Sequence, residues 1–472
     1  MMPRHVHLIA CGGTGMGSLA GMFKACGCHV TGSDQAIYPP MSEQLQAWGV
    51  HVFEGFDPQH LEPRPDLVIV GNAVRRDNPE AVAAQQAGLP IMSFPQALAH
   101  FFIQERHAVV VAGTHGKSTT TALIAWLLCH AGYDPGVFVG AVMRNFDRTF
   151  RLGAGPYFVV EGDEYDSAYF DKGPKFLHYR PRTAVLTSLE FDHADIYRDL
   201  AHLEAAFARF LQLLPQAGAL FACSDFPRVR ALLERTPLRA TVQTYGLATA
   251  ADWQVRDVAY DPDGTRFTVC YRGAAVGRFF SPLYGRHNVQ NALAAIAVGT
   301  HLGLKPPQLA AALAGFQHLK RRGEVRGQAA GVTVIDDFAH HPTAVRATLD
   351  AVRQAFPASR VWAVFEPRTA TSRRRVFQHD YARALRHADR VLVAEVYRKE
   401  QIPESERFSP PQLVQALQAS GVPAWFYERT EDIISHLCRE ARAPDVVVIM
   451  SNGGFDNIHQ RLLAALARRV AP

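Results

Sequence analysis

The residues with the clearest chemical pattern lie between positions 109 and 121, where an apolar strand, a glycine turn and a helix follow one another. The turn reads Gly113-Thr114-His115-Gly116-Lys117-Ser118-Thr119. In such a turn, backbone N–H groups and a helix N-terminus converge on one phosphate, while lysine adds a positive charge and serine a hydroxyl for Mg²⁺. We therefore predict a phosphate-binding loop, although Val111 stands where the general pattern has its first glycine. The alternative is a plain glycine turn with an exposed lysine.

Acidic residues follow the next predicted strand of this region. The run Glu161-Gly162-Asp163-Glu164 comes directly after the apolar residues 157–160, and Asp192-His193 comes shortly after a strand at 184–187. A carboxylate at the carboxyl end of a strand beside a phosphate loop is where Mg²⁺ is held. We predict a metal site at Ser118 and Glu161, with His193 as a candidate second ligand. The alternatives are a solvated acidic loop and a structural histidine.

A second glycine-rich turn lies near the N-terminus. It follows a predicted strand, opens a helix, and is completed by two polar residues at the end of the next strand; the residues are Gly12, Gly13, Thr14, Gly15, Met16, Ser33 and Asp34. This geometry binds a diphosphate on the helix dipole and a ribose hydroxyl on the acid. Both a dinucleotide and a nucleotide-sugar would fit. Because a separate phosphate loop exists, we favour a substrate diphosphate, with an NAD-dependent oxidoreductase as the alternative from another class.

Three further segments carry groups suited to ligands. His287, Asn288 and Asn291 precede a helix of small residues, and their amides suit an adenine edge, although a helix cap is equally consistent. Two further runs follow buried strands: 336–342 contains two aspartates and two histidines, and 366–375 contains four arginines. Arginine forks after a strand suit carboxylates or phosphates, and a solvated basic loop is the alternative. The run 451–455 is either an anion-binding nest or a helix entry.

The elements that position these groups alternate in a regular way. Short β-branched runs are separated by longer helical patterns, which predicts parallel sheets wrapped by helices. The predicted strands are His5–Ala10, His29–Thr31, Leu67–Val70, Ala108–Ala112, Phe158–Val160, Ala184–Thr187, Val332–Ile335, Arg360–Phe365, Arg390–Ala394 and Val446–Met450. Alternating residues in 253–259, 266–272 and 277–281 predict a small antiparallel addition.

The length of 472 residues predicts about three domains. One joint is expected at the polar run 104–107 and another near Gly315, before Lys320-Arg321-Arg322-Gly323. The expected domains are 1–106, 107–315 and 316–472. Their fold class is α/β, with a Rossmann-like N-terminal domain, a central P-loop ATPase-like domain and a Rossmann-like C-terminal domain.

Composition excludes several classes of protein. Hydrophobic residues make up 48% of the chain, so wholesale disorder is not expected. A net charge of +5 falls short of the basic face that nucleic-acid binding needs. Seven scattered cysteines without a CxxC pair indicate reduced thiols and no zinc site. No stretch is long and apolar enough for a membrane span, so we expect a cytoplasmic protein.

Together these segments resemble the Mur ligase family, ATP-dependent amide-forming enzymes of bacterial cell-wall synthesis, over essentially the whole chain. The resemblance rests on 113–119, 161–164, Asp192-His193, His287-Asn288 with Asn291, and 337–342. It implies ATP and Mg²⁺, with Lys117, His193 and His341 as catalytic residues. It also implies that Arg322, Asp337 and His340 join the phosphate loop in binding ATP. The turn at 12–16 with Ser33-Asp34 is similar to the branch that accepts UDP-N-acetylmuramate.

Within that branch, one enzyme adds L-alanine and another attaches the recycled tripeptide L-alanyl-γ-D-glutamyl-meso-diaminopimelate. The runs 38–42, 366–368, 372–377 and 451–455 look like the tripeptide enzyme, so Arg373, Arg374, Arg375, Ser451 and Asn452 are expected at the peptide. L-alanine is the alternative substrate, and a nucleotide-regulated binding protein is a third possibility.

Three features qualify the resemblance. Ser188 and Ser118 depart from the usual asparagine and threonine, and no lysine between Lys175 and Lys305 is present for carbamoylation. The resemblance further implies closure of three domains and a monomer or weak homodimer.

Overall fold

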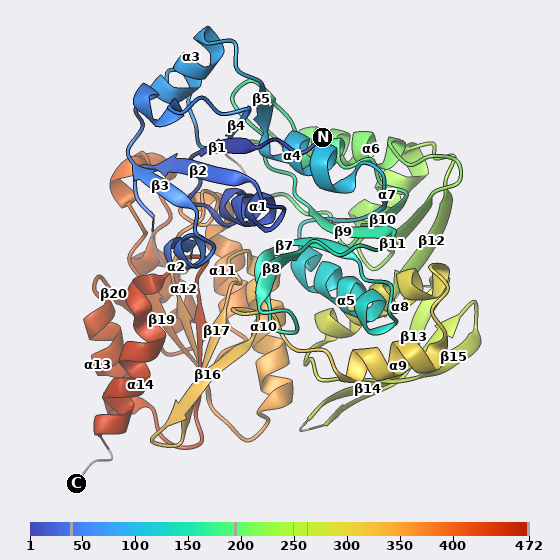
Figure 1. Ribbon diagram of the computed structural model, residues 1–472. Coiled ribbons are helices and arrows are strands. Elements are labelled where there is room, and N and C mark those ends of the chain that lie inside the picture. Colours follow the sequence, from blue (N-terminus) through green and yellow to red (C-terminus); the bar gives the residue numbers. More distant parts are fainter. Residues whose placement is uncertain (38–40, 193–195, 249, 262, 470–472) are drawn as a thin grey trace.

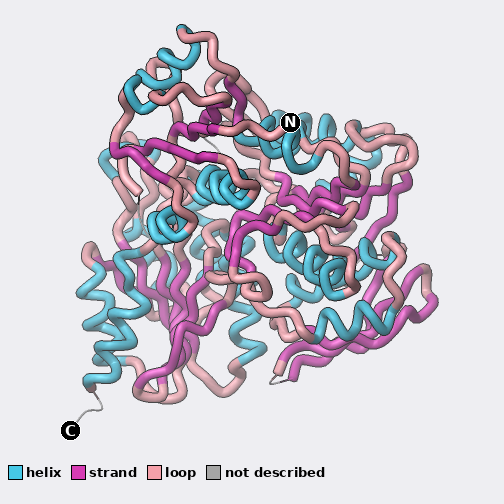
Figure 2. Tube along the Cα trace, in the orientation of Figure 1, coloured by secondary structure: helices cyan, strands magenta, loops and turns pink. Residues whose placement is uncertain are grey.

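The computed structural model describes residues 1–37, 41–192, 196–248, 250–261 and 263–469. They form three sheets, each with helices packed around it (Figure 1). The tube view in Figure 2 shows the same alternation of strands and helices along the chain. The α/β fold class with three domains is thereby confirmed.

The first sheet has five parallel strands, because each strand is followed by a helical connection that returns the chain to the same edge. Across the sheet these are β3 (His51–Glu54), β2 (His29–Asp34), β1 (His5–Ile9), β4 (Leu67–Val70) and β5 (Ile91–Ser93). Its helices are α1 (Thr14–Ala25), α2 (Met41–Ala47), α3 (Pro79–Gln86) and α4 (Phe94–Leu98), with single turns at Pro58–Leu61 and Ala99–Ile103.

The second sheet has ten strands, with the phosphate loop following its strand β6. In spatial order they are β15 (Ala274–Ser281), β14 (Gly264–Tyr271), β13 (Trp253–Asp261), β12 (Thr241–Gly246), β11 (Ala219–Cys223), β10 (Thr183–Leu186), β6 (His107–Ala112), β9 (Tyr157–Gly162), β7 (Gly136–Met143) and β8 (Arg148–Arg151). Its helices are α5 (Lys117–His130), α6 (Leu200–Gln212), α7 (Pro227–Arg235), α8 (Arg286–His301), α9 (Pro306–Ala314) and the turn Lys175–His178. The expected antiparallel addition is confirmed as β13, β14 and β15.

The third sheet has six strands. In order they are β16 (Glu324–Ala329), β17 (Val332–Asp337), β21 (Val446–Met450), β18 (Val361–Phe365), β19 (Arg390–Ala394) and β20 (Ala424–Tyr427). Its helices are α10 (Pro342–Ala355), α11 (Gln378–Leu385), α12 (Pro410–Ala419), α13 (Thr430–Glu440) and α14 (Ile458–Arg468), with short turns at Arg375–Phe377, Lys399–Gln401, Glu404–Glu406 and Phe455–Asn457.

Two antiparallel pairs depart from the expected parallel pattern, namely β7 with β8 and β16 with β17. In the second pair, Ala330 and Gly331 both have positive φ, at 51° and 73°. A two-residue turn of that kind reverses the chain in the sense that matches strand twist. The pair β16–β17 is therefore a tight hairpin at the edge of the third sheet.

Interior strands of the first and third sheets are buried on both faces. β4 reads Leu-Val-Ile-Val, and β21 reads Val-Val-Val-Ile-Met, with every residue buried. Such continuous apolar runs are typical of strands covered by helices on both sides. In the part of the chain that the structure describes, no helix has both the length and the hydropathy for a membrane crossing.

Candidate functional site

The predicted phosphate loop lies between the end of β6 and the start of α5. Gly116 precedes the helix with φ +79°, a left-handed conformation that favours glycine. A Cβ at this position would stand 2.5 Å from the Asn291 side-chain oxygen, so a larger residue would collide with α8. Lys117, Ser118 and Thr119 occupy the first turn of α5, where unpaired backbone N–H groups favour an anion.

Lys117 is held by both backbone and acid. Its Nζ donates to the Gly113 carbonyl at 2.8 Å and to the two carboxylate oxygens of Glu164 at 3.0 and 2.8 Å. Burial lowers the pKa of Lys117, but Glu164, Asp163 and Glu161 outweigh burial and raise it above the ordinary lysine value. The lysine is therefore charged and fixed at the mouth of the loop. Its pairing with Glu164 was not foreseen, because the sequence did not single out one of the acids in 161–166 as its partner.

Ser118 and Glu161 meet at the next corner of the loop. The Ser118 hydroxyl donates to Glu161 Oε1 at 2.9 Å, and Glu161 Oε2 accepts from the Gly140 N–H at 2.8 Å. A hydroxyl beside a carboxylate is an oxygen donor set that suits Mg²⁺. Arg322, from the segment that enters the third sheet, donates from Nη2 to Ser118 Oγ at 3.3 Å.

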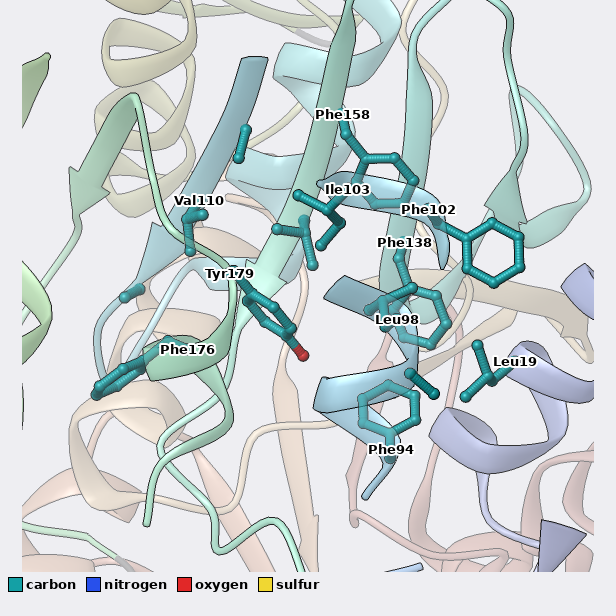
Figure 3. Close-up of a cluster of buried hydrophobic side chains, with 14 of the residues drawn as sticks. Leu19, Phe94, Leu98, Phe102, Ile103, Val110, Phe138, Phe158, Phe176 and Tyr179 are labelled. Carbon is teal, nitrogen blue, oxygen red and sulfur yellow. The ribbon is translucent and has the colours of Figure 1, made fainter. Parts of the chain in front are cut away.

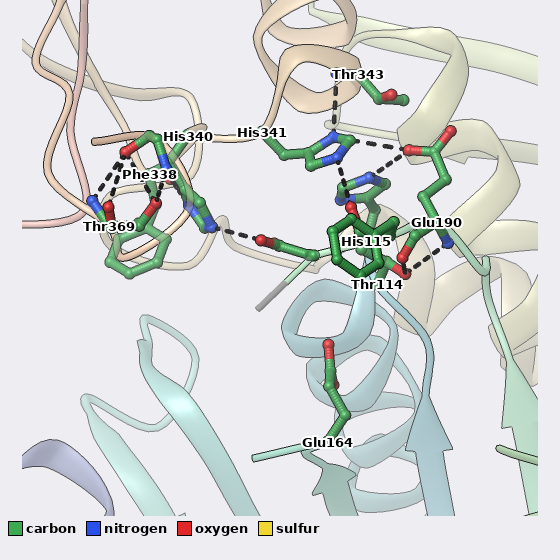
Figure 4. Close-up of polar contacts among 12 residues, drawn as sticks. Thr114, His115, Glu164, Glu190, Phe338, His340, His341, Thr343 and Thr369 are labelled. Carbon is green, nitrogen blue, oxygen red and sulfur yellow. Dashed lines mark hydrogen bonds and ion pairs between the residues drawn. The ribbon is translucent and has the colours of Figure 1, made fainter. Parts of the chain in front are cut away.

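Glu190 connects the loop with the third domain (Figure 4). Its Oε2 lies 2.8 Å from His115 Nε2 and 3.7 Å from His341 Nδ1. Burial raises the pKa of Glu190, but the hydrogen bond and charge of His115 dominate and lower it to about 2. His115, Glu190 and His341 are thus gathered from two domains. Sequence reasoning assigned no role to Glu190, although it lies two residues before Asp192, because its partners His115 and His341 belong to distant segments.

The two consecutive histidines of the third domain, His340 and His341, face the central domain. His341 precedes α10, where its Nδ1 accepts from the Thr343 N–H at 3.3 Å, and burial lowers its pKa to about 4. His340 Nε2 lies 3.8 Å from Asp192 Oδ2. His193, predicted as a catalytic and metal-binding residue, lies outside the described residues.

The predicted adenine residues occupy the first two turns of α8, which begins at Arg286 rather than after Asn291 as the sequence suggested. Gly285, with φ +91°, stands before the helix, so the helix includes the polar run. The Asn288 amide donates to the Tyr284 carbonyl at 2.8 Å, and the Asn291 amide donates to Asn288 Oδ1 at 3.1 Å. Burial lowers the pKa of His287 to about 4, so this imidazole is neutral at physiological pH.

Asp337 ends β17 and holds the segment that carries Arg322. Its carboxylate accepts from the Gly323 N–H at 2.6 Å and from the Ala339 N–H at 2.7 Å. Burial raises the pKa of Asp337 despite the nearby guanidinium of Arg322. The aspartate therefore orders the loop that reaches Ser118.

The N-terminal turn has the expected strand, turn and helix arrangement. Gly13 precedes α1, Thr14, Gly15 and Met16 form its first turn, and the Gly12 N–H donates to Asp34 Oδ2 at 2.7 Å. Ser33 donates its hydroxyl to Glu80, a fully buried acid in α3 that also lies 2.6 Å from His60 Nδ1. Glu80 was missed because a lone acid near a helix start reads as a surface residue.

The predicted peptide residues lie on the third domain. Arg373 donates to the Tyr397 carbonyl and to Gln401 Oε1, both at 3.3 Å, whereas Arg374 pairs with Glu406. Arg375 is exposed. The Ser451 hydroxyl donates to Glu366, and Asn452 lies beside it with a buried side-chain oxygen.

Three α/β domains with a charged lysine in a glycine loop place the chain in the class of three-domain nucleotide-dependent enzymes. Descriptions of known families match each domain in turn: "Mur ligase family, catalytic domain" over 5–106, "Mur ligase middle domain" over 111–299 and "Mur ligase, glutamate ligase domain" over 321–453. The chain belongs to the Mur ligase family.

Individual relatives agree with this assignment. The chain is 39% identical over 466 residues to the UDP-N-acetylmuramate--L-alanyl-gamma-D-glutamyl-meso-2,6-diaminoheptandioate ligase of Escherichia coli K12, covering 98% of both chains. A crystal structure of a murein peptide ligase from Psychrobacter arcticus 273-4 is similar with a TM-score of 0.74 and 37% identity, over 99% of this chain and 100% of that one. The UDP-N-acetylmuramate--L-alanine ligase of Arthrobacter sp. FB24 is 41% identical over 402 residues, covering 84% of this chain and 83% of its own.

Proposed function

We propose that the protein is an ATP-dependent amide ligase that joins UDP-N-acetylmuramate to the tripeptide L-alanyl-γ-D-glutamyl-meso-diaminopimelate in peptidoglycan recycling. The observation that carries the proposal is the phosphate loop of the central domain, where the charged Lys117 is followed by Ser118, whose hydroxyl accepts a hydrogen bond from Arg322 of the third domain. The choice of peptide is supported by the full-length similarity to the E. coli enzyme of that name. The L-alanine enzymes that match over 98% of the chain are only 31% and 32% identical, and the more similar one of Arthrobacter sp. FB24 covers 84% of it.

ATP is the phosphoryl donor in this proposal. Its β- and γ-phosphates lie on the loop 113–119, where Lys117 and the helix N-terminus offset their charge. Asn288 and Asn291 lie near the adenine, Asp337 lies near the ribose, and His340 faces the phosphates. Ser118 and Glu161, with His193 as a further candidate, would hold Mg²⁺, which would neutralise part of the phosphate charge.

The reaction proceeds in two steps. The lactyl carboxylate of the sugar attacks the γ-phosphorus, and the bond between this phosphorus and the oxygen that bridges it to the β-phosphate breaks. ADP departs, and the sugar carries an acyl phosphate. The amine of the peptide then attacks the acyl carbon, phosphate departs and the amine loses a proton. Lys117 stabilises the negative charge that spreads over the transferring group. His341 is neutral at pH 7, as a group that accepts a proton must be.

The substrates enter from different domains. UDP-N-acetylmuramate occupies the N-terminal turn, with its diphosphate at Gly12 to Met16 and its ribose near Asp34. The peptide occupies the third domain, where Arg373, Arg374, Arg375, Ser451 and Asn452 are the predicted contacts. We place the domain boundaries at 107 and 316 and the enzyme in the cytoplasm, as a monomer or weak homodimer.

Phosphate release with ATP, UDP-N-acetylmuramate and either the tripeptide or L-alanine tests the proposal. We expect turnover with the tripeptide to exceed turnover with L-alanine. Preference for L-alanine would reject the peptide substrate and retain the chemistry. ATP binding without ADP release would indicate a binding protein, and an absorbance change of a nicotinamide cofactor would indicate an oxidoreductase.

A further inference from the structure

Three neighbouring strands of the third sheet end at the same edge and bring their following loops together. β21 lies between β17 and β18, and Met450 is opposite both Asp337 and Phe365. The loop after β18 contains Glu366 and Arg368, and the loop after β21 contains Ser451 and Gly453. Carboxyl ends of parallel strands are where ligands bind in such sheets.

Arg368 is fixed at this edge from three directions. Its Nη1 lies 3.4 Å from Glu366 Oε1, and its guanidinium lies 3.7 Å from the centre of the Tyr397 ring. The third contact is with Gly453, where a Cβ would stand only 1.9 Å from Arg368 Nε. A guanidinium held in this way loses little conformational entropy when a ligand binds, which favours tight binding of an anion.

Glu366 is the acid that orients this group. It is buried and receives the Ser451 hydroxyl as well as Arg368. The carboxylate occupies one edge of the guanidinium, and in the described part of the chain no partner is found for Arg368 Nη2. The Arg368 side chain is 24% exposed, so a ligand can reach it.

A chain of contacts joins this edge to the phosphate loop. Arg321 donates from Nη2 to the carbonyls of Ser451 at 2.8 Å and Gly453 at 2.6 Å. The next residue, Arg322, donates to Ser118 in the loop. A substrate group bound at Arg368 is thereby held on the side of the third domain that faces the reacting phosphate.

The arginines further along the same loop are engaged differently. Arg373 and Arg374 bind groups at 397–406, and so hold the loop in place. The Ser372 hydroxyl accepts from the backbone N–H groups of Arg368 and Thr369, at 3.0 and 2.8 Å. These bonds fix the backbone from which Arg368 projects.

We infer that Arg368 binds a carboxylate of the incoming peptide and is a specificity-determining residue, with Glu366 and Gly453 as its positioning residues. The inference rests on the proposed tripeptide substrate, which carries several carboxylates. A planar guanidinium donates two parallel hydrogen bonds to a carboxylate, a geometry that lysine does not reproduce.

Steady-state kinetics of Arg368→Lys and Arg368→Ala, with each substrate varied in turn, test the inference. The KM for the tripeptide should rise by roughly 10- to 100-fold, the range for a lost charged hydrogen bond. The KM values for ATP and UDP-N-acetylmuramate should stay within about twofold, a small change on the free-energy scale. Arg439→Ala, which removes an exposed arginine from α13 of the same domain, is the matched control and should leave all three unchanged.

A second variant and a second substrate sharpen the test. Gly453→Ala should raise the KM for the tripeptide in the same direction, because its methyl group displaces the guanidinium, and thermal unfolding reports whether the fold is kept. Tripeptides in which one carboxylate at a time is amidated identify the group that Arg368 binds. For only one of them should Arg368→Ala leave the KM for the peptide unchanged.

The possible failures are distinguishable. If the wild-type enzyme does not ligate the tripeptide, the proposed function fails. If it does, but Arg368→Ala leaves the KM for the tripeptide unchanged or raises the KM for ATP instead, the inference about Arg368 is wrong.

Discussion

The central domain meets its two neighbours through interfaces of opposite chemistry. Toward the N-terminal domain the contact is apolar, and Leu19, Phe94 and Phe102 share one continuous core with Phe138 and Phe158 of the central domain (Figure 3). Toward the third domain it is polar, with Arg144–Glu324, Arg322–Ser118 and the His115–Glu190–His341 group. Burial of large apolar surface resists separation, whereas polar contacts exchange readily with water.

This difference predicts that the third domain moves relative to the other two. Because the first two domains are built on one core, they are expected to act as a single body that holds the sugar substrate and the phosphate loop. The third domain approaches that body across groups that ATP and peptide would also contact. Substrates can therefore exchange when this polar interface opens, and water is excluded when it closes.

Loss of Lys117, which precedes the interface residue Ser118 in the phosphate loop, should have the largest effect. We expect Lys117→Ala to reduce ADP formation by at least about 100-fold, since it removes charge stabilisation from the transferring phosphate. Binding of UDP-N-acetylmuramate, measured by calorimetry, should persist because its proposed site lies in the N-terminal domain. Lys172→Ala, which removes a largely exposed lysine paired with Asp166, is the control. Full turnover by the Lys117 variant would refute the role of the loop.

A cavity in the apolar interface should come next. Phe150 is buried and packs edge-on against Trp48 of the N-terminal domain, with ring centres 5.4 Å apart. Phe150→Ala should lower the free energy of unfolding by about 3–5 kcal/mol, and the two domains should unfold together in urea. Tyr260→Ala, at an exposed position, should have little effect. Separate transitions, of which only one shifts, would show that the two domains do not form one body.

Acidification should weaken the polar interface in two stages. The pKa of His341 is lowered from 6.5 to about 4, so the unfolded chain takes up this proton first and stability falls between these values. The pKa of Glu190 is lowered from 4.5 to about 2, so its contribution is lost as the pH falls through that lower window. Urea midpoints measured from pH 7 to pH 3 should decline less in His341→Phe above pH 4. An identical decline would contradict the assignment to His341.

The smallest effect is expected at an exposed bridge between the second and third domains. Arg144 Nη2 lies 3.3 Å from Glu324 Oε1, and its side chain is 44% exposed. Arg144→Ala should change the free energy of unfolding by less than about 1 kcal/mol, since Glu324 keeps Arg326 as a partner. A loss as large as that of Phe150→Ala would mean that the two interfaces do not differ in strength.

The sequence was informative where chemistry depends on neighbours along the chain. The loop at 113–119, the strand before Glu161 and the turn at 12–16 each combine a strand, glycines and a helix within a few residues, so local rules were enough to predict them. In the third domain β17, β18, β19 and β21 were predicted from their apolar runs, but β20 and the hairpin that β16 forms at Ala330-Gly331 were not, because these segments are less apolar and the turn signal is short.

The remainder depends on contacts between distant residues. Neither Glu190 nor Glu80 has its partners nearby in the sequence. Only the fold shows that the Glu190 carboxylate lies between two imidazoles and that the Glu80 carboxylate meets a hydroxyl and two imidazoles. The shared core of the first two domains is likewise invisible in any single segment. Arg368 belongs to a run that resembles the family, but only the fold shows that its guanidinium stacks on the Tyr397 ring and packs against Gly453, whereas Arg373 contacts the Tyr397 carbonyl.

Arg321 adopts a left-handed backbone, with φ +62°, and its side chain and that of Arg322 reach different domains. A rotation of the segment 321–322 would therefore move both the loop 451–454 and the contact with Ser118 in the phosphate loop. Occupancy of the phosphate loop by ATP and the conformation of the proposed peptide site are thereby coupled. Insertion of one or two glycines between Arg321 and Arg322 should remove this coupling and leave each site intact.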